Sequence, residues 1–373
     1  MALKQMPKQN KKMADEQPTR QLLYVTDDAP GFLRKKWGRG HRYFDASGAT
    51  IDKRTLNGRL ERLRIPPMWE SVWICAEPDG HLQATGYDEK GRKQYLYHPL
   101  WQEHRSRHKF DKLPEFGQAL PLIRERIAKD LCKRDWPKEK VLALVVSLLD
   151  ETYVRIGNQA YLKENKTYGL TTLRRKHLSL EGKKAVFCYR AKSGVQQTVS
   201  VQNPRLVRLV QQCNELPGHE LFRYYEKGTT GGQSISSGDV NQYLKEISGE
   251  DFSSKNFRTW GGTVTAVERL EEAQQEVAEN PRKDLLATVV KKVAERLGNT
   301  EAVCREYYIH PYILEAIESG YLSQNLNRFK ISEAGPYGLK PMEQVTLKVL
   351  QKQQKEKGEA IEILTADTPS EQN

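Results

Sequence analysis

The spacing of apolar residues changes near Pro114, and this change restricts the chain to a fold with two unlike parts. From Leu22 to about Lys112, apolar runs are short and are separated by turn signals such as Pro78-Asp79-Gly80. After Pro114, apolar residues recur every three or four positions, which is the spacing of amphipathic helices. We therefore predict an α+β chain with a small antiparallel β-rich N-terminal domain and a larger, mainly α-helical domain.

This pattern divides the chain into four segments. They are a flexible basic tail (1–19), the β-rich domain (20–112), the helical domain (113–340) and a C-terminal tail (341–373). The predicted strands are Leu22–Thr26, Val72–Cys75, Gln83–Thr85 and Gln94–Tyr97, with one helix at Ile51–Leu63. In the second domain we predict a β-hairpin from Lys184–Tyr189 and Gln196–Val201. The predicted helices there are Leu120–Cys132, Lys138–Tyr153, Pro204–Leu216, Ser237–Ser248, Thr263–Val277, Leu285–Leu297 and Ile313–Glu318.

Positive charge is concentrated in the first third of the chain. The whole chain has 60 Lys+Arg against 48 Asp+Glu, a formal charge of +12. Residues 1–112 hold 22 basic and 14 acidic side chains, which is two-thirds of the excess. Clustered cations favour a polyanionic partner, because each neutralised phosphate releases condensed counterions. Simple solubility is the alternative explanation, so the charge alone does not decide.

Several classes of protein are excluded by what the sequence lacks. No apolar run approaches the ~20 residues of a membrane span, and the lysine-rich N-terminus has no apolar stretch behind it. The five cysteines are scattered without a Cys-x-x-Cys pair, which is typical of reduced thiols in a cytoplasmic protein.

The common motifs for nucleotides and metals are missing too. There is no Gly-x-x-x-x-Gly-Lys-Ser/Thr loop and no Asp-x-Asp pair. His104 and His108 have the spacing of metal ligands, but their charged surroundings favour a solvated basic face. We therefore expect no metal, no nucleotide and no other cofactor.

Metal-free phosphoryl transfer needs a nucleophile, fixed cations on the phosphate oxygens and an acid for the leaving oxygen. Arg155, Lys192, Arg258 and Tyr308 supply these groups. Each has a structural alternative: Arg155 could complement the dipole at the end of a helix before Gly157, and Lys192 could be a solvent-facing hairpin residue. Arg258 opens a helix, where a cation opposes the dipole, so a functional role is more plausible. Tyr308 could be half-buried core, and its neighbour Tyr307 competes for its role.

The order Arg…Lys…(Lys-x-x-Arg)…Tyr resembles that of the type IB DNA topoisomerases, in their compact bacterial and poxvirus-like branch. The resemblance runs from about Leu22 to about Gly320. Its motifs include Pro66-Pro67-Met68-Trp69-Glu70-Ser71-Val72-Trp73, Gly91-Arg92-Lys93-Gln94-Tyr95-Leu96-Tyr97, Tyr168-Gly169-Leu170-Thr171-Thr172-Leu173, Phe257-Arg258-Thr259-Trp260 and Tyr308-Ile309-His310-Pro311.

The resemblance implies a role for each of five residues. Tyr308, which directly precedes Ile-His-Pro, would attack a DNA phosphodiester and form a 3′-phosphotyrosyl link, so that religation needs no ATP. Arg155 and Arg258 would hold the non-bridging oxygens, and Lys192 would protonate the departing 5′ oxygen. Asn299 falls where poxvirus-like members carry His; it can donate a hydrogen bond but no charge, and a helix-cap role competes with this one.

In the N-terminal domain, Gln94, Tyr95 and Tyr97 match a family segment that touches DNA in the major groove. Alternation along a strand puts the two tyrosines on one face and Gln94 on the other, although one tyrosine could equally be core. Arg92, Lys93 and the stretch Arg34–Arg42 are better suited to phosphates than to bases.

Two other functions compete with a topoisomerase. A tyrosine recombinase uses the same groups but usually has His at the position of Lys255, and a non-enzymatic basic DNA-binding protein would explain only the charge. The resemblance implies one chain clamping double-stranded DNA as a monomer, in the cytoplasm at the nucleoid, with no membrane or nucleotide partner.

Overall fold

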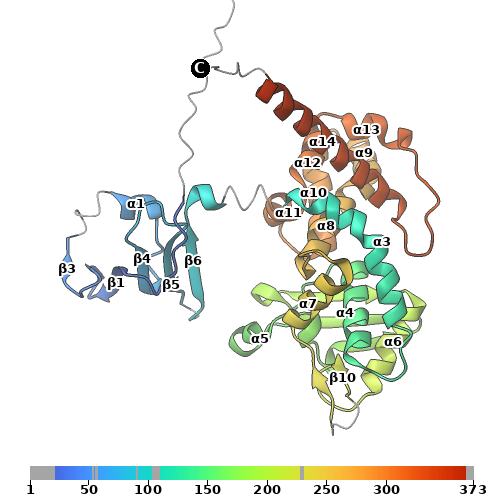
Figure 1. Cartoon of the computed structure of the whole chain (residues 1–373), viewed down its shortest axis with the longest axis horizontal. Helices are drawn as coiled ribbons and strands as arrows, with labels where there is room; N and C mark the ends of the chain where they lie inside the picture. The colour runs from blue at the N-terminus through green and yellow to red at the C-terminus, as the bar shows by residue number, and fades with distance from the viewer. Residues whose placement is uncertain are drawn as a thin grey trace, which may run out of the picture. The chain divides into compact units, whose positions relative to one another are not determined.

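The chain divides into two compact units, residues 1–107 and 108–373. The computed structural model describes residues 22–52, 54, 58–89, 91–102, 110–226 and 231–366. The first unit is built on a β-sheet and the second is mainly helical (Figure 1), so the predicted α+β fold class is confirmed. The predicted tail (1–19), His104 and His108 lie outside the described residues.

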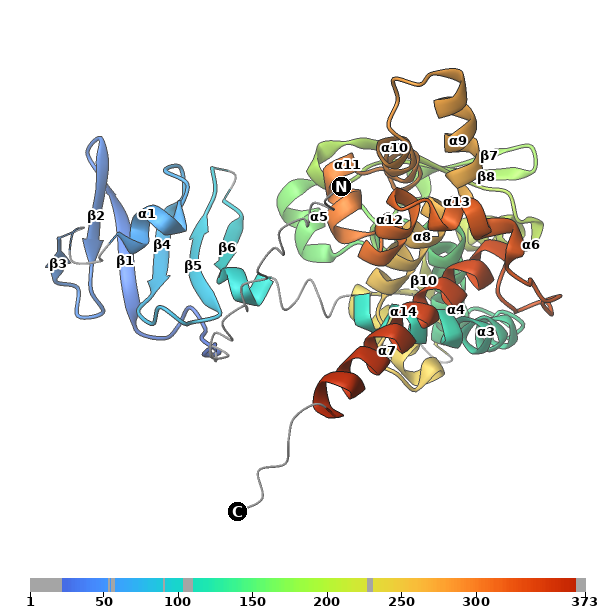
Figure 2. The ribbon, with the colours of Figure 1, turned by 90° about the horizontal axis from the view of Figure 1, so that it is seen from above.

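The N-terminal unit contains one antiparallel sheet with the strand order β3-β2-β1-β4-β5-β6. Its strands are β1 (Gly31–Trp37), β2 (Gly40–Phe44), β3 (Thr50–Ile51), β4 (Glu70–Cys75), β5 (Leu82–Tyr87) and β6 (Lys93–Tyr97). Helix α1 (Arg59–Leu63) lies against this sheet (Figure 2), where its Leu60 packs with Val72 and Ile74.

Three of the predicted strands are confirmed as β4, β5 and β6. Leu22–Thr26 is not a strand, because it contributes only an isolated bridge between Leu23 and Gly80. The predicted helix Ile51–Leu63 is wrong at its start, where β3 pairs with β2; its end is confirmed as α1, Arg59–Leu63.

Strands β1 and β2 occupy the stretch Arg34–Arg42, which the sequence indicated as a phosphate-binding surface. Arg34 contradicts that prediction, because it is only 4% exposed. Its guanidinium donates to the carbonyl oxygens of Pro66 and Trp69, both at 2.8 Å. These bonds satisfy carbonyl groups of the loop before β4, so Arg34 stabilises the unit from within.

The C-terminal unit packs a cluster of helices around one large core, with a small sheet at one side (Figure 1). The helices are α3 (Leu113–Asp130), α4 (Lys138–Thr152), α5 (Gln159–Asn165), α6 (Pro204–Glu215), α7 (Ser237–Ser248), α8 (Ser254–Glu268), α9 (Leu270–Glu279), α10 (Leu285–Leu297), α11 (Glu301–Tyr307), α12 (Pro311–Glu318), α13 (Tyr321–Asn325) and α14 (Pro341–Ala366). The sheets are β7 (Leu178–Glu181), β8 (Lys184–Arg190) and β9 (Gln196–Val201), in that order, and the pair β10 (Arg223–Tyr224) and β11 (Gln233–Ser234). The predicted hairpin is thus confirmed, with β7 as a third strand.

One predicted helix, Thr263–Val277, is wrong because it merges parts of two helices. Helix α8 begins at Ser254 and ends at Glu268, and α9 follows at Leu270. The pair Gly261-Gly262 is typical of a break, but here it permits close packing: a Cβ on Gly261 would lie 2.4 Å from the ring of Tyr153. Helix α8 therefore runs through the middle of the unit (Figure 2), with every residue from Phe257 to Val267 buried.

The segment 341–373, expected to be a tail, begins with a 26-residue helix, α14. Val345, Val349 and Leu350 on this helix are fully buried in the main core. Helix α14 packs against α3, α8 and α12. Its first turns are therefore part of the helical unit; the mixed Gln, Lys and Glu composition of the segment concealed this apolar face.

Candidate active site

Five side chains that are far apart in the sequence come together on the helical unit. Arg155 follows α4, Lys192 lies between β8 and β9, and Arg258 is on α8. Asn299 lies between α10 and α11, and Tyr308 ends α11. The charges of Arg258, Arg155 and Lys192 all act on the Tyr308 hydroxyl, so the structure places the predicted residues in one site.

Arg258 is anchored by the backbone of two neighbouring elements. It is 4% exposed; Nη1 donates to the carbonyl oxygen of Tyr153, and Nη2 donates to that of Leu297 at 3.1 Å. Its Nε is buried without a hydrogen-bond partner among the described residues. Both carbonyl groups lie at the C-terminal ends of helices, where they have no hydrogen-bond partner within the helix. The two Nη atoms therefore hold the guanidinium in place, and its Nε–H is left as a further donor.

Arg155 does not end its helix as expected. Helix α4 stops at Thr152, and Tyr153 takes the left-handed conformation (φ 56°) as the C-cap. Gly157, which the sequence indicated as the cap, instead lies against Gly169, where a Cβ would come within 2.9 Å of the backbone. The chain has left the helix before Arg155, so this side chain is free to turn toward the site.

Asn299 is the hydrogen-bond partner of Arg155. Nη2 of Arg155 donates to Oδ1 of Asn299, whereas Nδ2 of Asn299 is buried without a partner among the described residues. The competing cap roles belong to its neighbours. Gly298 is the C-cap of α10 at φ 59°, and Thr300 is the N-cap of α11.

The structure separates Tyr308 from Tyr307. Tyr307 is 42% exposed, and its hydrogen bond to Glu306 raises its pKa. Tyr308 is half-buried, with the Arg258 guanidinium carbon 4.9 Å from the centre of its ring. Burial alone would raise the pKa of Tyr308, but Arg258, Arg155 and Lys192 outweigh it and hold the pKa below its usual value. Of the two tyrosines, Tyr308 therefore has the hydroxyl that ionises more readily.

Two residues of α8 that the sequence did not single out hold the backbone of Tyr308. Thr263 is fully buried; its hydroxyl accepts from the backbone N–H of His310 at 3.1 Å and lies 3.3 Å from the Tyr308 carbonyl oxygen. Gly262 lets the Tyr308 carbonyl oxygen lie close to α8, because a Cβ at this position would be only 2.6 Å from it. Helix α8, which carries Arg258, thus also holds the backbone at Tyr308. These contacts join residues 45 or more positions apart, so the sequence pattern did not show them.

Lys192 lies at the tip of the β8–β9 hairpin, as predicted. It is exposed, in a 3₁₀ turn where Ser193 and Gly194 have φ of 65° and 79°. This turn places the exposed lysine at the edge of the site, which suits a group that reaches a substrate.

The predicted DNA-binding residues of the N-terminal unit form a row along β6 and the turn before it. Tyr95 and Tyr97 share one face of the strand, as predicted, with ring centres 6.2 Å apart and nearly parallel. Arg92 and Lys93 are paired within the unit: Arg92 Nη2 lies 2.6 Å from Asp88 Oδ2, and Lys93 Nζ lies 2.5 Å from Asp27 Oδ2.

Gln94 also donates to Asp88 Oδ2, at 2.9 Å. The three polar side chains of this row are therefore oriented by carboxylates, and their contact with DNA stays a prediction.

The ranges that the structure describes contain neither a metal-binding cluster nor a membrane-spanning helix. There, no three or more His, Cys, Asp or Glu side chains are grouped so that they could hold a metal ion. Within the same ranges, no helix has both the length and the apolar character to cross a membrane.

Comparison with known families assigns both units. Residues 98–331, which contain all five site residues, match the family model of the catalytic core of eukaryotic DNA topoisomerase I. Residues 40–88 match the N-terminal domain of bacterial DNA topoisomerase IB. The chain therefore belongs to the type IB DNA topoisomerases, which are isomerases.

Individual relatives agree with this assignment. The chain is 29% identical to DNA topoisomerase 1B of Acanthamoeba polyphaga mimivirus over 297 residues, which is 78% of this chain and 88% of the viral protein. It is 24% identical to DNA topoisomerase 1B of vaccinia virus (strain Copenhagen) over 267 residues, 69% of this chain and 81% of that protein.

A solved structure of the XerH site-specific recombinase bound to its palindromic difH substrate resembles part of this chain. The match covers 55% of this chain and 51% of the recombinase chain. The TM-score is 0.35 and the sequence identity is 15%, which is too weak a similarity to indicate function.

Proposed function

We propose that this protein relaxes supercoiled double-stranded DNA through a transient single-strand break. The observation that carries the proposal is the convergence of Arg155, Lys192 and Arg258 on Tyr308. Basic residues in excess on the N-terminal unit support a role in holding the duplex. Because one chain contains the whole site, we propose that a monomer acts alone, at the nucleoid in the cytoplasm.

In the proposed reaction, the Tyr308 oxygen attacks a backbone phosphorus and the bond from phosphorus to the 5′ oxygen breaks. The tyrosine is then linked to the 3′ phosphate, and the 5′ hydroxyl leaves with a proton from Lys192. The free end rotates, and the hydroxyl attacks the phosphotyrosine to reverse every step. Since one phosphoester replaces another, religation needs no ATP.

Arg155 and Arg258 would stabilise the pentacoordinate transition state. Their planar guanidinium groups match pairs of phosphate oxygens, and Arg258 is held in advance by two carbonyl groups. Asn299 orients Arg155, and its unpartnered Nδ2 could donate to a phosphate oxygen. Arg155, Arg258 and Lys192 supply the positive charge that phosphoryl transfer requires, so we propose that the reaction needs no metal ion.

Plasmid relaxation tests the proposal directly. Purified protein should relax both positively and negatively supercoiled plasmid in EDTA without ATP. A plasmid that is bound but never relaxed would favour a non-enzymatic DNA-binding protein. Strand exchange between paired specific sites, without general relaxation, would favour a recombinase.

Lys192→Ala should slow cleavage of ordinary DNA strongly, because the 5′ oxygen would then leave without a proton. A 5′-phosphorothiolate substrate should restore the rate, since sulfur leaves readily as a thiolate. Single-turnover cleavage of both substrates measures this. Lys184→Ala, an exposed lysine at the other end of β8, is the matched control and should cleave both substrates normally. Absence of thiolate rescue would remove the acid role from Lys192.

The pH dependence of cleavage should report the lowered pKa of Tyr308. The tyrosinate is the nucleophile, so the rate should rise with pH and level off with its midpoint below the ordinary value of 10.0. The phosphorothiolate substrate is suitable because its leaving group needs no acid. With it, Lys192→Ala should move the midpoint upward, as one positive charge near the tyrosine is lost. A midpoint at or above 10.0 in the unaltered protein would contradict the electrostatic argument.

A further inference from the structure

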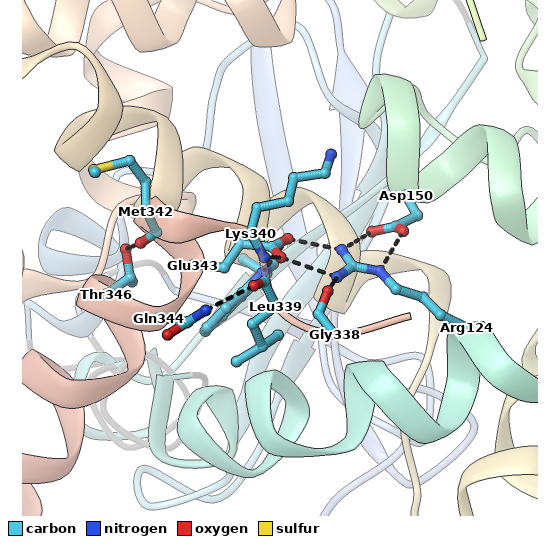
Figure 3. Close-up of polar contacts among 10 residues, drawn as sticks. Arg124, Asp150, Gly338, Leu339, Lys340, Met342, Glu343, Gln344 and Thr346 are labelled. Carbon is cyan, nitrogen blue, oxygen red and sulfur yellow. Dashed lines mark hydrogen bonds and ion pairs between the residues drawn. The ribbon is translucent and has the colours of Figure 1, made fainter. Parts of the chain in front are cut away.

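A buried ionic cluster joins the C-terminal helix to the rest of the helical unit (Figure 3). Arg124 on α3 lies between two carboxylates. Its Nε and Nη2 donate to Asp150 on α4 at 2.8 and 3.0 Å, and its Nη1 and Nη2 donate to Glu343 on α14 at 2.9 and 2.7 Å. Nη1 also donates to the carbonyl oxygen of Gly338 at 3.1 Å. All five N–H groups of the arginine are therefore used.

Glu343 is the member of this cluster that the family resemblance does not cover. The matched catalytic core ends at residue 331, whereas α14 begins at Pro341. Glu343 is nevertheless 1% exposed, accepts from the backbone N–H of Lys340 at 2.8 Å and lies 3.4 Å from the indole Nε1 of Trp260. A helix beyond the matched region thus supplies a buried charge to the core of the helical unit.

Glu343 stays ionised in this cluster. Burial alone would raise the pKa of Glu343, but the Arg124 guanidinium outweighs it and lowers the pKa. Burial would likewise lower the pKa of Arg124, but Glu343 and Asp150 raise it. Removing one partner would leave the remaining charges buried and incompletely paired, a costly arrangement that favours movement of the attached elements.

The elements attached to this cluster carry the two active-site arginines. Asp150 precedes Tyr153 by three residues at the end of α4, and the carbonyl oxygen of Tyr153 accepts from Arg258. Arg155 follows on the same segment. Trp260 is two residues beyond Arg258 on α8, and its ring fits against Gly117 of α3, where a Cβ would lie 2.4 Å away. The cluster thus sets the position of the α4 end relative to α8.

We propose that Glu343, at the start of α14, is a positioning residue for Arg258 and acts through Arg124 and Asp150. This inference rests on the proposed DNA cleavage by Tyr308. Glu343 touches neither Tyr308 nor any group assigned to the substrate; it fixes the carbonyl group that orients the Arg258 fork.

Glu343→Gln tests the proposal, because glutamine keeps the shape and one acceptor but removes the charge. We expect single-turnover cleavage to slow by about tenfold, which is an ordinary effect between residues joined by hydrogen bonds. The Kd for DNA should stay within about twofold of normal. The decisive measurement is a double-mutant cycle. In an Arg258→Lys background, where the oriented fork is already lost, Glu343→Gln should slow cleavage little further.

Two other residues of α14 serve as matched controls. Thr346→Val removes a buried hydroxyl that donates only to the Met342 carbonyl oxygen, one turn from the cluster (Figure 3), and should leave cleavage unchanged. Val349→Ala opens a cavity under the same helix and should lower the melting temperature without slowing cleavage at 25 °C. These variants separate loss of stability from loss of positioning.

Three outcomes would overturn the inference. They are normal cleavage by Glu343→Gln, an equal deficit in Val349→Ala at matched stability, and an undiminished effect of Glu343→Gln in the Arg258→Lys background. If Glu343→Gln fails to fold, Asp150→Asn breaks the cluster at its other end and should show the same dependence on Arg258. Failure of the unaltered protein to cleave DNA would instead refute the proposed function.

Discussion

Tyr308→Phe should abolish plasmid relaxation completely while DNA binding persists. The substitution removes the oxygen to which we assign the covalent link and leaves the ring, whose centre lies 4.9 Å from the Arg258 guanidinium carbon. The fold should therefore remain intact, and no protein–DNA adduct should survive denaturation with detergent. Relaxation assays, adduct gels and a binding isotherm measure the three expectations together.

Tyr307→Phe is the matched control for this experiment. Tyr307 is adjacent in sequence but exposed, and its hydroxyl interacts with Glu306. We expect it to relax plasmid at close to the normal rate. The opposite result, with Tyr308→Phe active and Tyr307→Phe inactive, would move the nucleophile by one residue and contradict the electrostatic assignment.

Arg258→Ala should slow single-turnover cleavage by about 10²-fold or more, the usual effect of removing one transition-state donor. That factor corresponds to at least about 2.7 kcal/mol of transition-state stabilisation. Arg258→Lys should recover little of the loss, because an ammonium cannot reproduce a fork that is held by two carbonyl groups. DNA affinity should change much less than the cleavage rate.

Arg269→Ala is the control for this variant. Arg269 follows the last residue of the same helix, α8, is exposed and pairs with Glu272 at 2.8 Å. Its loss should leave cleavage within about twofold of normal, as surface ion pairs contribute little. Cleavage by Arg258→Ala within tenfold of the normal rate would mean that Arg258 only supports the fold.

Prediction from sequence succeeded where the signal was local. The apolar spacing of Lys138–Tyr153 and Leu285–Leu297 gave helices α4 and α10 almost to the residue, and the hairpin around Lys192 was also confirmed. It failed where packing overrides a local rule. Consecutive glycines such as Gly261 and Gly262 are typical of a helix break. Here they lie inside α8, and their lack of side chains leaves room for Tyr153 and Tyr308.

For charged residues, the sequence did not show which partners they have. Arg34, Arg92 and Lys93 all fitted a phosphate-binding surface by composition. In the fold, Arg34 is buried on carbonyl groups, and the other two are paired with Asp88 and Asp27. Whether a cation is available to a ligand depends on its partners, and those of Arg34 and Lys93 are distant in the sequence.

The sequence by itself determined the α+β class, the family and the order of Arg155, Lys192, Arg258, Asn299 and Tyr308, because these follow from local spacing and short motifs. The tertiary structure decided which tyrosine faces the cations, what orients Arg258, and that α14 belongs to the helical unit. Arg155 and Asn299 are 144 positions apart, and Arg124 and Glu343 are 219 apart. Burial and pairing over such separations arise from packing, which no local pattern of residues records.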